Sequence, residues 1–187
     1  MNIVLFGPPG AGKGTQAKYL VKKLNNFQVS TGDMLRDEIQ KDTPIGKKII
    51  KNMNDGKFVE DEIVNKLLEK IVFDTTKINK LIFDGYPRTI NQAKNLERLL
   101  EKSNQKLDHI FFLNVKKEAI IKRVEKRKIL EKRSDDEAET ILKRYDTYME
   151  VTKPVLDFYS SKSNFYEIDG SAEIEVISGK IEEILRV

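Results

Sequence analysis

The chain has 187 residues, of which 39% are apolar and 34% charged, and its 34 basic and 30 acidic side chains leave a net charge of +4. This length suits one domain with a substantial core, and so small and mixed a surplus of charge does not require nucleic acid as a partner. The absence of cysteine excludes disulfides and thiolate zinc sites. No run approaches the roughly 18 apolar residues that span a bilayer, so we expect a cytoplasmic domain with no membrane segment.

Short apolar runs alternate along the chain with longer segments of helical periodicity, a pattern typical of βαβ units. The runs predict strands at Ile3 to Phe6, Phe27 to Val29, Leu81 to Phe83, His109 to Val115 and Phe165 to Ile168. The periodic segments predict helices at Lys13 to Leu24, Ala93 to Lys102, Lys117 to Lys126, Asp136 to Ser160 and Ile174 to Leu185. We therefore expect an α/β fold of three layers around a central parallel sheet of five strands.

Two intervals break this alternation. Residues 30–60 hold helical pieces, punctuated by Thr43-Pro44 and Gly46, and lead back to the sheet through Ile63 to Ile71. Residues 128–136 form a short polar insertion between two predicted helices. The chain contains no internal repeat, so these intervals are expected to be excursions from one domain.

A glycine-rich stretch, Gly7 to Thr15, lies between the first predicted strand and the first predicted helix. Its glycines let the backbone turn tightly and point successive N–H groups inward, and Lys13 adds a positive charge for the outer phosphates. The stretch therefore predicts a site for a nucleoside triphosphate. In the general motif a Ser or Thr follows the lysine directly, whereas here Gly14 comes before Thr15.

Charged residues follow the second and third predicted strands, at the sheet edge where ligands of such folds bind. Asp84 ends an apolar run and suits the acidic residue that organises Mg²⁺ and its waters, with a helix or turn cap as the alternative. Arg36 and Arg88 each lie just beyond a glycine and suit bidentate contact with phosphate, although each by itself is also compatible with an ordinary surface arginine. Together they predict a second anionic ligand.

These segments resemble the nucleoside monophosphate kinase family, and most closely its adenylate kinases, over essentially the whole chain. The glycine loop is similar to that family's variant, including the glycine after the lysine. Ser30 to Asp33, and Phe83 to Thr89 with Gln92 three residues on, resemble its monophosphate-site motifs. The resemblance implies a P-loop kinase fold and reversible, Mg²⁺-dependent phosphoryl transfer from ATP to AMP, giving two ADP. It also implies a monomer whose partners are these nucleotides, active in purine nucleotide interconversion and energy-charge homeostasis.

The resemblance further implies roles for individual residues. Thr15 and Asp84 would lie beside Mg²⁺, through water, and the phosphates of ATP would be held by Gly10, Ala11, Gly12, Lys13, Gly14 and Thr15. The AMP site would be formed by Thr31, Arg36, Lys57, Phe58, Val59, Gly85, Tyr86, Pro87, Arg88 and Gln92. Two positions depart from the family's pattern: Glu60 stands where proline is common, and Tyr86 where phenylalanine is common.

Residues 126–136 resemble the short type of lid found in this family, and the lack of cysteine excludes the four-cysteine zinc version of longer lids. Arg123 would lie near the ATP base, Arg127 near its phosphates, and Arg133 and Arg144 near the transferring group and AMP. The backbone of Ala172 would contact the ATP base. Lys128 to Lys132 replaces the glycines of many short lids, which predicts a stiffer and more helix-prone segment. The resemblance thus divides one domain into a core (1–29, 60–125 and 137–187), a monophosphate-binding segment (30–59) and the lid.

The chemistry can be argued from the residues themselves. An acceptor phosphate is already a competent nucleophile and needs no strong base, so positioning and charge stabilisation must dominate. The positive groups assigned to catalysis are Lys13, Arg88, Arg127, Arg133 and Arg144. With Arg36 and Arg123 they exceed what one nucleotide needs, which favours a site for two anions.

Alternatives remain at this point. A kinase for UMP and CMP would share the loop and the arginines, and a nucleotide-dependent switch would share the loop but leave Arg36, Arg88 and Gln92 unexplained.

Three smaller expectations concern structure. Asp33 is expected to cap a helix, and His109 to be a satisfied edge residue rather than a base. The aromatic residues expected to pack on a long helix are Tyr145, Tyr148, Phe158 and Tyr159.

Overall fold

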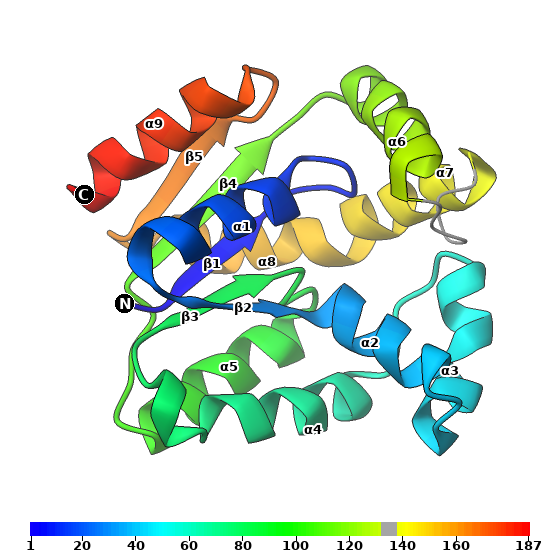
Figure 1. Ribbon diagram of the computed structural model, residues 1–187, viewed down its shortest axis with the longest axis horizontal. Helices are drawn as coiled ribbons and strands as arrows, with labels where there is room; N and C mark the ends of the chain where they lie inside the picture. Colours follow the sequence, from blue (N-terminus) through cyan, green and yellow to red (C-terminus); the bar gives the residue numbers. More distant parts are fainter. Residues whose placement is uncertain (132–137) are drawn as a thin grey trace.

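The computed structural model describes residues 1–131 and 138–187, with side chains described for 1–126 and 139–187. Its described part contains one parallel sheet of five strands in the order β2-β3-β1-β4-β5, which confirms the predicted α/β fold (Figure 1). The strands are β1 (Ile3–Phe6), β2 (Phe27–Ser30), β3 (Leu81–Asp84), β4 (His109–Asn114) and β5 (Phe165–Asp169). Each agrees with the predicted run to within one residue at either end.

Helices connect these strands and cover both faces of the sheet (Figure 1). They are α1 (Lys13–Leu24), α2 (Thr31–Gln40), α3 (Pro44–Asn54), α4 (Asp61–Val72), α5 (Ile90–Lys102), α6 (Lys117–Glu131), α7 (Ala138–Thr147), α8 (Lys153–Ser160) and α9 (Ile174–Leu185), with a short 3-10 helix at Thr75–Lys77. The helix expected from Asp136 to Ser160 is interrupted by a π-helical turn, Tyr148–Thr152, which separates α7 from α8. No helix among the described residues has the length and apolar character needed to cross a bilayer.

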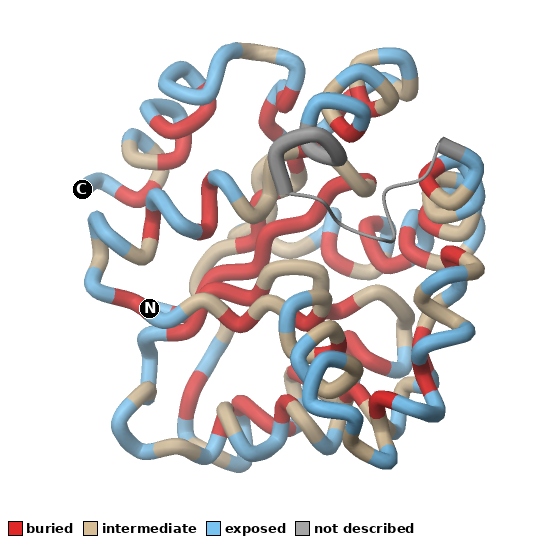
Figure 2. Tube along the Cα trace, turned by 45° about the vertical axis from the view of Figure 1, so that its right-hand side comes forward, coloured by how far each residue is buried: buried red, intermediate tan, exposed pale blue. Residues whose placement is uncertain are grey.

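Alternate side chains of the strands build two apolar cores, one on each face of the sheet. On β1, Val4 and Phe6 join the core formed with α2, α3, α4, α5 and α8. Ile3 and Leu5 join the core formed with α1, α6, α7 and α9. Figure 2 shows the buried residues concentrated along the central strands. Because both faces are covered, the inner strands β1 and β3 read as nearly continuous apolar runs, and this made them recognisable in the sequence.

Two local predictions are wrong. Ser30, not Asp33, caps α2: the Ser30 hydroxyl accepts a hydrogen bond from the Asp33 backbone N–H, and Asp33 lies in the first turn, where its carboxylate pairs with Arg36. His109 begins an inner strand, where it stacks on Phe111 and contacts the tilted ring of Tyr166, and its Nδ1 is buried without a hydrogen-bond partner among the described residues. Burial lowers the pKa of this imidazole. It lies at the amino end of the strand, the opposite end from the glycine loop.

Helices α2 and α3 pack closely at Gly46. A methyl group at this position would lie 2.1 Å from the carbonyl oxygen of Glu38 and 2.8 Å from the Cα atom of Ile39. Because backbone atoms cannot yield as a flexible side chain can, we expect Gly46→Ala to lower the free energy of unfolding by at least about 2 kcal/mol in a denaturant titration.

Gly179 in α9 offers the matched control for that substitution. A methyl group there meets nothing within 4 Å. Gly179→Ala should therefore raise the free energy of unfolding by about 0.5–1 kcal/mol, since alanine is the better helix former. Equal stability of Gly46→Ala and the parent protein would contradict the close packing of α2 on α3.

Candidate functional site

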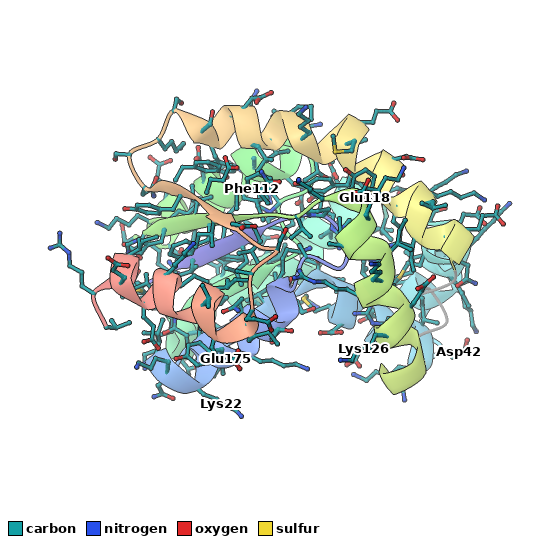
Figure 3. All side chains as sticks on the ribbon, turned by 90° about the horizontal axis from the view of Figure 1, so that it is seen from above. Lys22, Asp42, Phe112, Glu118, Lys126 and Glu175 are labelled. Carbon is teal, nitrogen blue, oxygen red and sulfur yellow. The ribbon has the colours of Figure 1, made fainter. Side chains whose placement is uncertain are left out.

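A cleft of about 640 Å³ opens beyond the carboxyl ends of the strands, above the start of α1. Its walls include the glycine loop, the start of α2, the end of β3, one side of α6 and the residues that lead into α9. Figure 3 shows Lys126, which lines the cleft, on α6, and Glu175 on α9 well apart from it in this view. The predicted residues that line it are Gly10, Ala11, Gly12, Lys13, Gly14, Thr15, Arg36, Asp84, Gly85, Arg88, Arg123, Arg144 and Ala172.

The glycine loop turns directly into α1, which begins at Lys13. Gly10 has φ +80°, and a methyl group on it would lie 2.7 Å from Val124 Cγ2, so this position admits only glycine. Lys13 Nζ donates to the carbonyl oxygens of Gly7 and Pro8, at 2.8 and 2.9 Å. A cation and a helix N-terminus therefore meet at one wall of the cleft, an arrangement that attracts phosphate.

Asp84 lies against the same loop. Its Oδ2 is 3.4 Å from where a Cβ atom on Gly14 would be, and it accepts a hydrogen bond from Gln28 Nε2 at 3.0 Å. The alternative interpretation of Asp84 as the cap of the next helix does not hold, because Thr89 caps α5. The Asp84 carboxylate and the Thr15 hydroxyl both line the cleft, so two oxygen-bearing side chains lie beside the wall formed by the glycine loop and the start of α1.

Two smaller hollows adjoin the cleft. One, of about 40 Å³, is bounded by α2, the end of α3 and residues Lys57, Phe58 and Val59. The other, of about 50 Å³, lies behind the glycine loop against Tyr86, Pro87 and the π-helical turn. Arg88 and Arg144 line both hollows and the large cleft. These two guanidinium groups therefore stand at the junction of all three spaces.

The geometry around Arg88 is closely defined. Its Nε donates to the Gly85 carbonyl oxygen at 2.8 Å, and the guanidinium lies over the Phe58 ring, 5.2 Å from the ring centroid. The hydroxyl of Thr31 donates to the same carbonyl oxygen at 2.8 Å. Arg36 extends from α2 rather than from a loop and forms an ion pair with Asp33. The loop after β3 and helix α2 thus place Arg88 and Arg36 beside the same small hollow, the one of about 40 Å³.

The remaining predicted residues are distributed as follows. Thr31 and Gln92 are buried and line none of these three spaces. Arg123 Nη1 donates to the Ala11 carbonyl oxygen at 3.4 Å, so α6 holds this arginine beside the glycine loop. Arg127 belongs to α6, but its side chain lies outside the described residues, as does the whole of Arg133.

Sequence reasoning missed several residues of the site. Lys126 lines the cleft, and Tyr148 and Thr152 line the hollow behind the glycine loop. Tyr148 was expected only to pack. Its position four residues after Arg144, with Thr152 four residues further, was the available signal, because this spacing places all three on one helical face.

The fold and the site together define a phosphotransferase of the P-loop class, in which one large cleft and two small hollows meet at two arginines. Comparison with known proteins identifies the family within this class: a family model described as "Adenylate kinase" matches residues 5–164. The chain belongs to the adenylate kinase family. Its reaction is the transfer of a phosphoryl group from ATP, the donor, to AMP, which gives two ADP.

Individual relatives agree with this assignment. The adenylate kinase of Pelagibacter ubique (strain HTCC1062) is 50% identical, with 100% of both chains covered. That of Mycoplasma mycoides subsp. mycoides SC (strain CCUG 32753 / NCTC 10114 / PG1) is 42% identical, with 92% of this chain and 94% of the relative covered. That of Caulobacter sp. (strain K31) is 41% identical, with 100% of this chain and 99% of the relative covered. The similarity extends over the segments that form the site.

Proposed function

We propose that ATP occupies the large cleft, that AMP occupies the hollow beside α2 and α3, and that the phosphoryl group passes between them at Arg88 and Arg144. The observation that supports this most directly is that both arginines border the cleft and the two smaller hollows. A group at this junction is within reach of both nucleotides. It can therefore stabilise negative charge throughout the transfer.

On the donor side, the backbone N–H groups of residues 10–15 and Lys13 hold the phosphates of ATP. Arg123 and the backbone of Ala172, on opposite walls of the cleft, flank the base. The start of α1 adds its dipole to the charge of Lys13. We assign Arg127 and Arg133 to the phosphates from the family resemblance, as part of a lid at residues 126–136.

The residues at the cleft suit Mg²⁺. This ion prefers oxygen ligands, retains several waters, and commonly uses one or two carboxylates together with substrate phosphates. Asp84 and Thr15 provide such oxygens beside the loop. Bound there, Mg²⁺ would neutralise charge on the phosphates. We propose that both residues hold it through water.

On the acceptor side, Arg36 and Arg88 grip the phosphate of AMP, and the main chain of Lys57, Phe58 and Val59 lines the pocket for the nucleoside. Thr31, Gly85, Tyr86, Pro87 and Gln92 support this site from beneath. The acceptor oxygen needs no base, so orientation of the two phosphates and exclusion of water provide the catalysis.

We propose the same domain division as the resemblance implies: a core, a monophosphate-binding segment at residues 30–59 and a lid at residues 126–136. The monophosphate-binding segment contains α2 and α3 and borders the small hollow. A monomeric state and a cytoplasmic location stay predictions from the sequence.

A coupled assay with Mg·ATP and one monophosphate at a time tests the assignment. We expect ADP to form with AMP at a kcat/KM at least about a hundredfold above that with CMP, UMP or GMP, since a specific base pocket discriminates by hydrogen bonding. Preference for a pyrimidine monophosphate would overturn the choice of AMP. Full activity in excess EDTA would contradict the role of Mg²⁺.

A further inference from the structure

Gln92 lies at the centre of a partly buried polar network that joins three segments of the chain. The network, which we call the Gln92 clasp, links the start of α4, the loop after β3 and the start of α5. Its members are Asp61, Asn65, Tyr86, Thr89, Gln92 and Asn95. The network lies close to the proposed AMP site, where it can affect how AMP binds.

The side-chain amide of Gln92 has only one possible orientation. Its Oε1 accepts a hydrogen bond from the Arg88 backbone N–H at 2.8 Å, and its Nε2 donates to Asp61 Oδ1 at 2.7 Å. A backbone N–H can only donate and an ionised carboxylate can only accept, so the amide cannot be reversed. Asp61 therefore determines which atom of Gln92 faces Arg88.

Asp61 is itself held by a second bond. The Thr89 hydroxyl donates to Asp61 Oδ2 at 2.7 Å, while the same hydroxyl oxygen accepts the Gln92 backbone N–H as the cap of α5. Both carboxylate oxygens of Asp61 are thus engaged by the first turn of α5. Hydrogen bonds to a carboxylate are stronger than those between neutral groups, so this contact fixes α4 to α5.

The hydroxyl of Tyr86 secures the other side of Gln92. It lies 2.8 Å from Asn65 Oδ1 and 3.1 Å from the Gln92 carbonyl oxygen, and it accepts from Asn95 Nδ2 at 3.2 Å. Tyr86 is 1% exposed, and burial raises its pKa to about 12. The hydroxyl is therefore protonated at neutral pH and stays a donor.

The clasp lies between two parts of the proposed AMP site. Asp61 is the first residue of α4 and follows Val59 by two residues, so it anchors the end of the monophosphate-binding segment. Arg88, whose backbone N–H is held by Gln92, lines the same hollow as Phe58 and Val59. The distance between the Arg88 guanidinium and this backbone decides how a monophosphate fits.

We infer that Asp61 is a positioning residue for AMP, which acts through Gln92 to hold the Arg88 loop in register with residues 57–59, and that the Tyr86 hydroxyl supports it. The inference rests on the proposed function, because it assumes that AMP binds in this hollow. Asp61 lines none of the three spaces of the site, so it acts without contacting a nucleotide. Its effect is to keep Arg88 aligned before AMP arrives.

Asp61→Ala tests this, with Glu62→Ala as the matched control. Both residues are acidic side chains in the first turn of α4, so both substitutions remove the same charge from the same helix N-terminus. Glu62 is exposed and has no part in the clasp. We expect Asp61→Ala to raise the KM for AMP by about tenfold, with the KM for ATP changed less than about twofold, and Glu62→Ala to leave both KM values unchanged.

A measurement without nucleotide separates positioning from the proposed reaction. Hydrogen exchange of the Arg88 backbone amide should be at least about tenfold faster in Asp61→Ala than in the parent, while the amide of Ile82 in β3 exchanges as before. This result would support the clasp even if the nucleotide assay failed to show AMP as the acceptor. Unchanged exchange at Arg88 would overturn the inference.

A second variant keeps the test decisive if Asp61→Ala does not fold. Tyr86→Phe removes only the hydroxyl and should raise the KM for AMP about threefold, in the same direction and without effect on ATP. An unchanged KM for AMP in every variant that folds would overturn the inference. An equal rise in the KM for AMP and the KM for ATP, together with a lower melting temperature, would also overturn it, because a purely structural role would have that effect.

Discussion

Replacing Lys13 with methionine should lower kcat by about a thousandfold, the largest effect that we expect from any single substitution. The Lys13 Nζ atom lies 2.8 Å from the Gly7 carbonyl oxygen and 2.9 Å from that of Pro8, at the N-terminus of α1. A methionine fills a similar volume but brings no charge to the phosphates. Single-turnover measurements with Mg·ATP and AMP would isolate the loss in the chemical step.

Lys22→Met provides the control for this substitution. Lys22 lies on the same helix and is exposed, and Figure 3 shows it at the edge of the molecule. The control should keep kcat within about twofold of the parent value, since an isolated surface charge contributes little. If kcat of Lys13→Met fell by less than about tenfold, the backbone N–H groups of the loop would suffice to stabilise the phosphates without the lysine charge.

The second large effect is expected for Arg88→Lys, which should lose at least about 2 kcal/mol of transition-state stabilisation, or roughly thirtyfold in kcat/KM for AMP. The bond from Arg88 Nε to Gly85 and the contact with the Phe58 ring fix the plane of the guanidinium. A lysine has no such plane and binds phosphate as a point charge. Steady-state kinetics with AMP varied at saturating Mg·ATP would measure the loss.

Arg186→Lys is the matched control for Arg88→Lys, because Arg186 is exposed at the end of α9 and lines none of the three spaces of the site. It should leave kcat/KM for AMP unchanged. The role assigned to Arg88 would have to be abandoned if its lysine variant retained full catalytic efficiency.

The sheet and most helices could be predicted because their signals are local and repeated. The inner strands β1 and β3 are buried on both faces and read as apolar runs, and the helices between the strands show a regular 3.6-residue pattern. The π-helical turn at Tyr148–Thr152 could not be predicted, because a single extra residue in a helix leaves the apolar pattern nearly unchanged. The prediction of Asp33 as the cap of α2 was wrong, and Ser30 caps this helix instead, because both residue types suit that position.

The site could be predicted where residues follow directly after strands. Parallel strands end at one edge, so Lys13, Arg36, Asp84 and Arg88 were expected to converge, and all four line the large cleft. The Gln92 clasp escaped prediction because its bonds join side chains such as Asp61 and Gln92 that are 31 positions apart. Such pairs have no periodicity in the sequence. The side chains of Arg127 and Arg133 lie outside the described residues and stay predictions.

The end of α3 touches α7. The Thr140 hydroxyl donates to the Asn54 carbonyl oxygen at 3.3 Å, and a methyl group on Gly56 would lie 2.9 Å from the Thr140 carbonyl oxygen and 3.1 Å from Cγ of Arg144. A shift of residues 30–59, the proposed monophosphate-binding segment, would therefore be transmitted to α7, whose Arg144 also lines the large cleft. Binding of the two substrates should therefore be thermodynamically linked. Bound AMP should lower the Kd for ATP, and bound ATP should lower the Kd for AMP by the same factor.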